Sequence, residues 1–163
     1  MRKTYLWLGT LVLGVLLLTL IGCAGGGAPK VDWEIKITGA VEKPMTVTYA
    51  DLVKRPQVKL ENILMQRSQG EDSYDTWEGP ALWPILEEAG ISPKATAITA
   101  TAADGYAIQI ALSDIPKERT IIALKQNGEW SAEDKEHGPL RIVVDGLPGN
   151  HWIFQVTEIR VEE

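Results

Sequence analysis

Apolar and polar residues alternate along several short stretches of the chain, and this pattern predicts β-strands. In residues 31–38, Val31, Trp33, Ile35 and Ile37 are apolar, whereas the residues between them are polar. A period of two is typical of a strand with one buried face. Apolar segments bounded by turn residues predict further strands at 45–49, 58–66, 96–101, 106–112, 120–125, 140–144 and 152–161.

Two helices are predicted between these strands. Thr48 and Asp51 have the spacing of a capping box, so a short helix over 51–54 is expected, and Pro56 ends it. A second helix is predicted over 81–89, because its apolar residues repeat at the spacing of one helix face: Leu82, Ile85, Leu86 and Ala89.

The connections between elements complete the predicted fold. Strand 58–66 is expected to place Val58, Leu60 and Leu64 on one face, and the polar segment 69–75 is expected to be a loop. Many short strands with few short helices predict an α+β fold, mostly β, in a single domain.

Composition and charge narrow the function classes. The 163-residue chain contains 16 Lys and Arg against 22 Asp and Glu, which gives a formal net charge of −6. This acidic balance argues against nucleic-acid binding, because contacts to phosphates need clustered basic residues. The single cysteine excludes an internal disulfide framework and a C-x-x-C metal site.

The N-terminal segment resembles a bacterial lipoprotein signal. Arg2 and Lys3 precede an apolar run over 5–21, which ends in Leu20-Ile21-Gly22-Cys23. The resemblance implies cleavage before Cys23 and attachment of a diacylglycerol, with palmitate among its acyl chains. The alternatives are a plain secretory signal or an uncleaved membrane anchor.

This resemblance sets the expected domain boundaries and location. Residues 1–22 would be the signal peptide, 23–30 the lipidated cysteine and a glycine-rich tether, and 31–163 the folded domain. The mature protein would be held at the cell membrane by lipid on Cys23 and would face outside the cytoplasm.

The order of motifs in the rest of the chain resembles the oxidoreductase molybdopterin-binding domain family, which has the sulfite-oxidase-like fold. The motifs are ITGAVEKP at 37–44, TVTYADL at 46–52, WEGPAL at 77–82 with LEEAG at 86–90, DGY at 104–106, LKQNGE at 124–129 and HGPLRIVV at 137–144. Each motif is weak alone, but their order and spacing together indicate this fold.

The resemblance implies a molybdenum–pterin cofactor whose metal is bound by a cysteine thiolate, a soft ligand suited to that metal. In the family this cysteine lies after the second main strand and before the W-x-G helix. The corresponding segment here, 64–70, contains no cysteine, and Met65 or Ser68 would be a poor substitute. The resemblance therefore supports the fold and fails at the main catalytic residue.

Three residues are candidates for binding an anionic ligand. Arg141 and His137 lie in the motif that the family places beside its cofactor or substrate, and Arg67 lies in the segment expected to face the cofactor. The planar guanidinium of Arg suits phosphate or sulfate oxygens. The alternatives are an Arg141 paired with a carboxylate, and an Arg67 that is simply solvated.

Other residues give weaker signals. His151 is expected on the surface, and the two histidines do not form a zinc motif. Trp83 or Trp130 could line a ligand groove or a partner surface, although most tryptophans are expected to pack in the core. The acidic residues Asp72, Asp75 and Glu78 could bind calcium, but a solvated acidic loop is the better interpretation.

The sequence favours a membrane-anchored, extracytoplasmic binding module with no catalytic residue and no metal ligand of its own. Its ligand would be a small anion, a molybdopterin-like cofactor or a partner protein of an exported redox system. One alternative is a molybdenum enzyme in which Ser68 or an external ligand replaces the thiolate. Another is a structural or assembly lipoprotein without a ligand.

Overall fold

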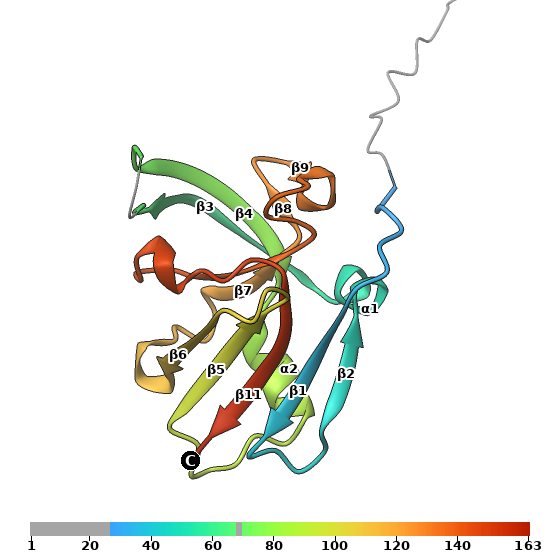
Figure 1. Cartoon of the computed structure of the whole chain (residues 1–163), viewed down its shortest axis with the longest axis vertical. Helices are drawn as coiled ribbons and strands as arrows, with labels where there is room; N and C mark the ends of the chain where they lie inside the picture. The colour runs from blue at the N-terminus through green and yellow to red at the C-terminus, as the bar shows by residue number, and fades with distance from the viewer. Residues whose placement is uncertain (1–26, 68–69) are drawn as a thin grey trace, which may run out of the picture.

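A five-stranded sheet forms one side of the protein in the computed structural model, which describes residues 27–67 and 70–163 (Figure 1). The strands lie in the order β2-β1-β11-β5-β6, in which β1 and β11 are parallel and the other neighbours are antiparallel. Their bounds are β1 Glu34–Gly39, β2 Met45–Thr48, β5 Ala97–Ala102, β6 Ala107–Ala111 and β11 Val156–Glu162.

The first strand shows how the alternating pattern produces this sheet. Ile35 and Ile37 are fully buried, and Ile37 lies opposite Ile159 of β11. Because successive side chains of a strand point to opposite faces, the polar residues between them remain outside the core. The predicted strand is confirmed, although it begins at Glu34 rather than at Val31.

A second sheet has four strands in the order β3-β4-β8-β9. The long β3–β4 hairpin curves away from the five-stranded sheet as an arm (Figure 1). The strands are β3 Gln57–Met65, β4 Ser73–Pro80, β8 Lys125–Gln126 and β9 Glu129–Trp130. Asn127 and Gly128 join β8 to β9 with φ angles of 52° and 86°, as expected of a tight hairpin turn.

A buried two-stranded pair lies beside the arm. It consists of β7 Thr120–Ala123 and β10 Arg141–Val144, and every residue of both strands is buried. The backbones of β4 and β7 approach closely at Gly79, where an added Cβ would lie 2.0 Å from the carbonyl oxygen of Ile122. Only glycine fits this position.

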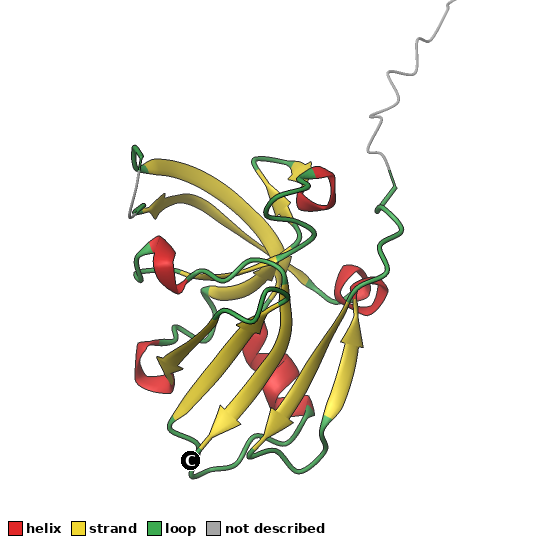
Figure 2. Cartoon of the chain, in the orientation of Figure 1, coloured by secondary structure: helices red, strands yellow, loops and turns green. Residues whose placement is uncertain are grey.

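The two α-helices follow the local signals in the sequence (Figure 2). Helix α1, Tyr49–Lys54, begins with the predicted capping box, in which the Thr48 and Asp51 side chains each accept from the other residue's backbone N–H. Helix α2, Leu82–Glu88, buries Leu82, Ile85 and Leu86 as predicted. Short 3₁₀ turns occur at Leu112–Asp114, Ser131–Glu133 and Gly149–His151.

Two predictions for the arm are wrong. The segment 69–75 is not entirely loop, because β4 begins at Ser73. On β3, Leu60 and Ile63 are buried, whereas Leu64 is only partly buried. A bulge between Leu60 and Ile63, with Asn62 at a φ of 55°, shifts the alternation by one residue.

Both sheets, the strand pair and the helices share one hydrophobic core. The prediction of a mostly-β α+β fold in a single domain is confirmed. Within the described ranges, no helix has the length and apolar character needed to cross a membrane. The predicted signal and Cys23 lie outside those ranges.

Candidate functional site

A pocket of about 340 Å³ lies where the end of β3, the start of β10 and the segment after β10 meet. Arg67, His137 and Arg141, the three residues proposed from the sequence, all line it. They come from segments up to 74 positions apart, from residue 67 to residue 141, and the fold brings them to one place. The remaining lining residues are Met65, Gln66, Gly149, Asn150, Trp152 and Phe154.

Arg141 is the first residue of β10, and its side chain is buried among apolar groups, with the residue only 8% exposed. Its guanidinium carbon lies 5.4 Å from the ring centroid of Trp77 and 5.5 Å from that of Phe154. Its Nη1 lies 3.7 Å from the sulfur of Met65, a weak hydrogen-bond acceptor. The guanidinium is therefore held by rings and a thioether rather than by anionic groups.

No carboxylate among residues 27–67 and 70–163 lies within ion-pairing distance of Arg141. The alternative of a structural arginine paired with a carboxylate is therefore not supported in this part of the chain. Burial lowers the pKa of Arg141 below its ordinary value, and the charge of Asp134 offsets part of this effect. A buried charge without a partner is costly, so its presence beside a pocket points to an anionic ligand.

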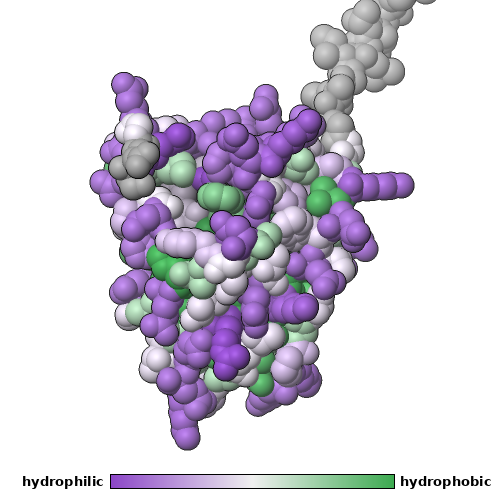
Figure 3. Space-filling model, viewed as in Figure 1, coloured by the Kyte–Doolittle hydropathy of each residue, from purple (hydrophilic) through white to green (hydrophobic). Residues whose placement is uncertain are grey.

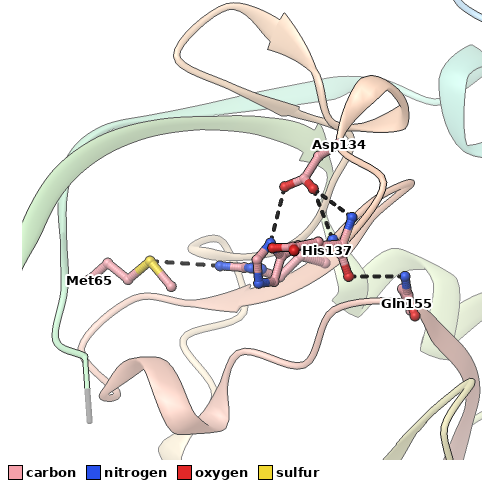
Figure 4. Close-up of polar contacts among 6 residues, drawn as sticks. Met65, Asp134, His137 and Gln155 are labelled. Carbon is pink, nitrogen blue, oxygen red and sulfur yellow. Dashed lines mark hydrogen bonds and ion pairs between the residues drawn. The ribbon is translucent and has the colours of Figure 1, made fainter. Parts of the chain in front are cut away.

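His137 reaches the pocket from a loop that Asp134 organises (Figure 4). The Asp134 carboxylate accepts hydrogen bonds from the backbone N–H groups of Glu136 and His137, and it lies 3.2 Å from His137 Nδ1. The backbone hydrogen bond from His137 is the main reason why the pKa of Asp134 is lowered. Contact with Asp134 occupies Nδ1, which leaves Nε2 as the ring nitrogen for a ligand.

The loop before Arg141 is closely packed. An added Cβ at Gly138 would lie 1.9 Å from the carbonyl oxygen of Ser131, so the chain can follow this path only with glycine there. The imidazole of His137 packs edge-on against the ring of Phe154, with the two ring centroids 4.9 Å apart. These contacts fix the histidine at the edge of the pocket.

Arg67 follows β3, and the arm positions its backbone. Its N–H donates to Asp72, and its Nη2 lies 3.4 Å from Ser73 Oγ. Neighbouring Asp75 is only 7% exposed. Burial raises the pKa of Asp75, but hydrogen bonds from Ser73 and Asn127 outweigh it, so the net pKa is lowered and the carboxylate stays charged.

Sequence reasoning did not find the wall of the pocket formed by Gly149 and Asn150, the first two residues of the 3₁₀ turn Gly149–His151. The Gly149 N–H donates to the carbonyl oxygen of Gln66 at 2.8 Å, and this bond joins the turn to the end of β3. An added Cβ at Gly149 would lie 2.7 Å from the same oxygen. The sequence signal was only a loop rich in glycine and proline, which does not indicate its distant partner.

Several other candidates lie outside the pocket. His151 does not line it, and its Nδ1 lies 3.0 Å from Asn150 Oδ1. Trp83 and Trp130 are only partly exposed, and each has a lysine over its ring. The Nζ of Lys117 lies 3.7 Å from the ring centroid of Trp83, and the Nζ of Lys125 lies 4.5 Å from that of Trp130. On the face shown in Figure 3, hydrophobic residues form scattered small areas on a largely polar surface.

The acidic residues of the arm each contact other protein groups. Asp72 accepts a hydrogen bond from the backbone N–H of Arg67, and Asp75 accepts hydrogen bonds from the side chains of Ser73 and Asn127. The Glu78 carboxylate lies 3.6 Å from Lys125 Nζ. In the described ranges, no three His, Cys, Asp or Glu side chains are grouped to hold a metal ion. The interpretation as a solvated loop is also wrong for Asp75, which lies buried in β4.

A larger cavity of about 530 Å³ lies between residues 28–32 and helix α1. Its lining is mainly apolar, and its charged residues are Lys30, Asp32 and Lys54. None of the three predicted site residues lines it. The smaller pocket around Arg141 is therefore the better candidate, because it gathers the buried cation and the polar groups.

The sequence model of the oxidoreductase molybdopterin binding domain matches residues 25–163. The chain belongs to the oxidoreductase molybdopterin-binding domain family. It is similar to a nitrate reductase [NADH] of Volvox carteri, with 28% identity over 174 residues, which covers 85% of this chain and 20% of the relative. It is also 28% identical over 116 residues to the uncharacterized oxidoreductase YuiH of Bacillus subtilis, covering 71% of this chain and 58% of the relative.

The fold has a counterpart among solved structures. The sulfane dehydrogenase SoxCD of Paracoccus pantotrophus superposes with a TM-score of 0.71 and 23% identity, over 83% of this chain and 40% of that chain. This likeness confirms the sulfite-oxidase-like fold. The chain spans only about a fifth of the nitrate reductase and less than two thirds of YuiH or SoxCD.

The family name raises the question of whether these residues fit a molybdopterin. The anionic part of such a group fits the pocket, because the Arg141 guanidinium is buried there without a carboxylate partner among the described residues. The metal fits less well. The single cysteine, Cys23, precedes the family domain, and the described residues provide no thiolate for a soft metal. Ser68 lies outside the described residues.

Proposed function

We propose that this member of the oxidoreductase molybdopterin-binding domain family is a non-catalytic module that binds a small anionic ligand, including the anionic end of a pterin-like cofactor. The observation that carries the proposal is Arg141, a buried guanidinium at the pocket with which no described carboxylate forms an ion pair. A ligand anion would provide the missing counter-charge.

The chemistry of the pocket supports this class of ligand. A guanidinium offers a planar set of N–H donors that can bind two oxygens of a phosphate or sulfate at once. Arg67 adds a second positive charge at the lining, and His137 adds a ring nitrogen. The volume of about 340 Å³ is at the lower end of the range of ligand pockets, roughly 300–1,000 Å³.

Loss of catalysis is proposed because none of the described residues that line the pocket supplies the thiolate that suits molybdenum. The thioether of Met65 lies there, but it already accepts from a cation and carries no charge of its own. The alternative remains an oxidoreductase in which Ser68 or an external ligand binds the metal. A purely structural role has less support, because the two candidates for an apolar partner surface, Trp83 and Trp130, are partly buried and each has a lysine over its ring.

Metal and pterin content of the purified protein tests this proposal. The full chain would be produced in a host that makes molybdenum cofactor, and molybdenum and extractable pterin would be measured per chain. We expect pterin without stoichiometric molybdenum, and we expect Arg141→Leu to lose the pterin. One molybdenum atom per chain would contradict the non-catalytic proposal, whereas absence of both would restrict the ligand to a smaller anion.

We also propose that the module is a lipoprotein at the outer side of the cell membrane, where it would serve a partner protein of an exported redox system. The support is the lipobox-like sequence that ends in Cys23. Acyl chains contribute roughly 0.8 kcal/mol per buried methylene, so a multiply acylated cysteine is a firm anchor. We expect the membrane-bound protein to begin at Cys23 and to carry acyl chains there, which mass spectrometry of its N-terminal peptide would show. An N-terminus that retains residues 1–22 without added mass on Cys23 would argue for an uncleaved anchor.

A further inference from the structure

The sulfur of Met65 contacts Arg141 at the pocket, and oxidation of this sulfur would change the contact. The Met65 sulfur lies 3.7 Å from Arg141 Nη1 and is the only hydrogen-bond acceptor that the described residues place on this side chain. A thioether is a weak acceptor, whereas the oxygen of a sulfoxide is polar and accepts hydrogen bonds well. One added oxygen would therefore change the partner of the buried cation.

Met65 is held in place and is also accessible. It is the last residue of β3, it pairs with Ser73 of β4, and the next residue accepts a hydrogen bond from the Gly149 N–H. The residue is partly exposed and lines the pocket. Figure 4 shows the hydrogen bond that its sulfur accepts. A small oxidant that enters the pocket can reach the sulfur without any opening of the core.

We propose that Met65 is an oxidation site that closes the anion pocket, with a peroxide as the oxidant. The sulfur attacks one oxygen of hydrogen peroxide, the S–O bond forms and the O–O bond breaks. The departing hydroxide takes the proton from the transferred oxygen, which yields methionine sulfoxide and water. The sulfur loses two electrons and the peroxide gains them, so no further reductant or oxidant is needed.

The sulfoxide would compete with the ligand for Arg141. The sulfoxide oxygen would be bonded to a sulfur that already lies beside Arg141 Nη1. This oxygen would accept hydrogen bonds from the N–H groups that the ligand would otherwise use. The guanidinium is buried and has one weak acceptor among the described residues, so the new hydrogen bond would form away from competing water. This inference rests on the proposed function, because it assumes that the pocket binds an anion through Arg141.

The chain provides a matched control in Met45. Both methionines are partly exposed residues of β-strands, but Met45 lies on β2 and does not line the pocket. The full chain, with Met65→Leu and Met45→Leu variants, would be treated with hydrogen peroxide, and peptide mass spectrometry would locate each added oxygen. Inorganic phosphate affinity would be measured for each protein before and after treatment.

We expect oxidation to weaken phosphate binding about tenfold in the wild type and in Met45→Leu, and to leave the affinity of Met65→Leu unchanged. A methionine sulfoxide reductase with a thiol would restore the wild type. Equal affinity of the oxidised and unoxidised wild type, with Met65 shown to carry the oxygen, would overturn the inference. Absence of added oxygen at Met65 would overturn it as well.

A second readout separates failure of this inference from failure of the proposed function. If the unoxidised protein binds no phosphate, the proposed function fails, but the contact between the sulfoxide and Arg141 can still be tested by thermal unfolding. Oxidation of Met65 should lower the unfolding midpoint less in the wild type than in Arg141→Leu, where the new oxygen has no buried cation to accept from. Equal decreases in both proteins would overturn the inference independently of any ligand.

Discussion

Replacing Arg141 by leucine is expected to raise the free energy of unfolding of the ligand-free protein by about 1 kcal/mol, although the change removes a charged residue from the interior. The guanidinium is buried between Trp77 and Phe154 without an ion pair among the described residues. An apolar side chain of similar volume avoids the cost of desolvating the charge. The measurement is urea unfolding of both proteins in buffer free of multivalent anions.

Arg119→Leu is the matched control for this prediction. Arg119 is half exposed and pairs with Asp145 at the surface. Exposed ion pairs contribute roughly 0–1 kcal/mol, so the control is expected to be neutral or slightly destabilised. A loss of several kcal/mol in Arg141→Leu would instead mean that Arg141 holds the fold together, and the argument for an anionic ligand would lose its basis.

Replacing Trp77 by alanine is expected to lower the free energy of unfolding by about 3–5 kcal/mol. Trp77 is 1% exposed on β4, and its ring meets that of Trp152 edge-on at 5.9 Å. Its removal would leave a large cavity beneath Arg141. Small domains have roughly 5–15 kcal/mol of total stability, so this single change would bring the protein close to unfolding.

Trp83→Ala provides the control for this cavity. Trp83 is partly exposed on α2, where its Nε1 donates to Glu87 and Lys117 lies over its ring. Loss of these surface contacts is expected to cost about 1 kcal/mol. Similar losses for the two variants in urea unfolding would show that Trp77 does not have the central packing role that its burial indicates.

The parts of the fold that were predicted correctly depend on local sequence signals. The alternation at Ile35 and Ile37 and the capping box at Thr48 each determine their own structure within a few residues. The order of the motifs then indicated the family, which the match over residues 25–163 confirms.

The errors occur where tertiary contacts override the local pattern. The start of β4 is polar, and its Asp75 is nevertheless buried. Burial is possible because Asp75 accepts a hydrogen bond from Asn127, a residue 52 positions later in the chain. On β3, a single residue with positive φ changes which apolar side chains are buried, and the sequence does not mark this bulge.

The candidate site was predicted in part. Arg67, His137 and Arg141 were singled out by residue type and by resemblance, and the structure brings all three to one pocket. That no described carboxylate pairs with Arg141 could not be foreseen, because it depends on which carboxylates approach in space. The wall around Gly149 depends in the same way on a contact between β3 and a distant loop.

The most direct test of the central claim is calorimetric titration of inorganic phosphate into the wild-type protein and into Arg141→Leu. If Arg141 is kept buried to bind an anion, the wild type binds one phosphate. The variant, although at least as stable, should then bind it at least 30-fold more weakly, which corresponds to about 2 kcal/mol. Equal affinities in the two proteins, or no binding to the wild type, would contradict the account.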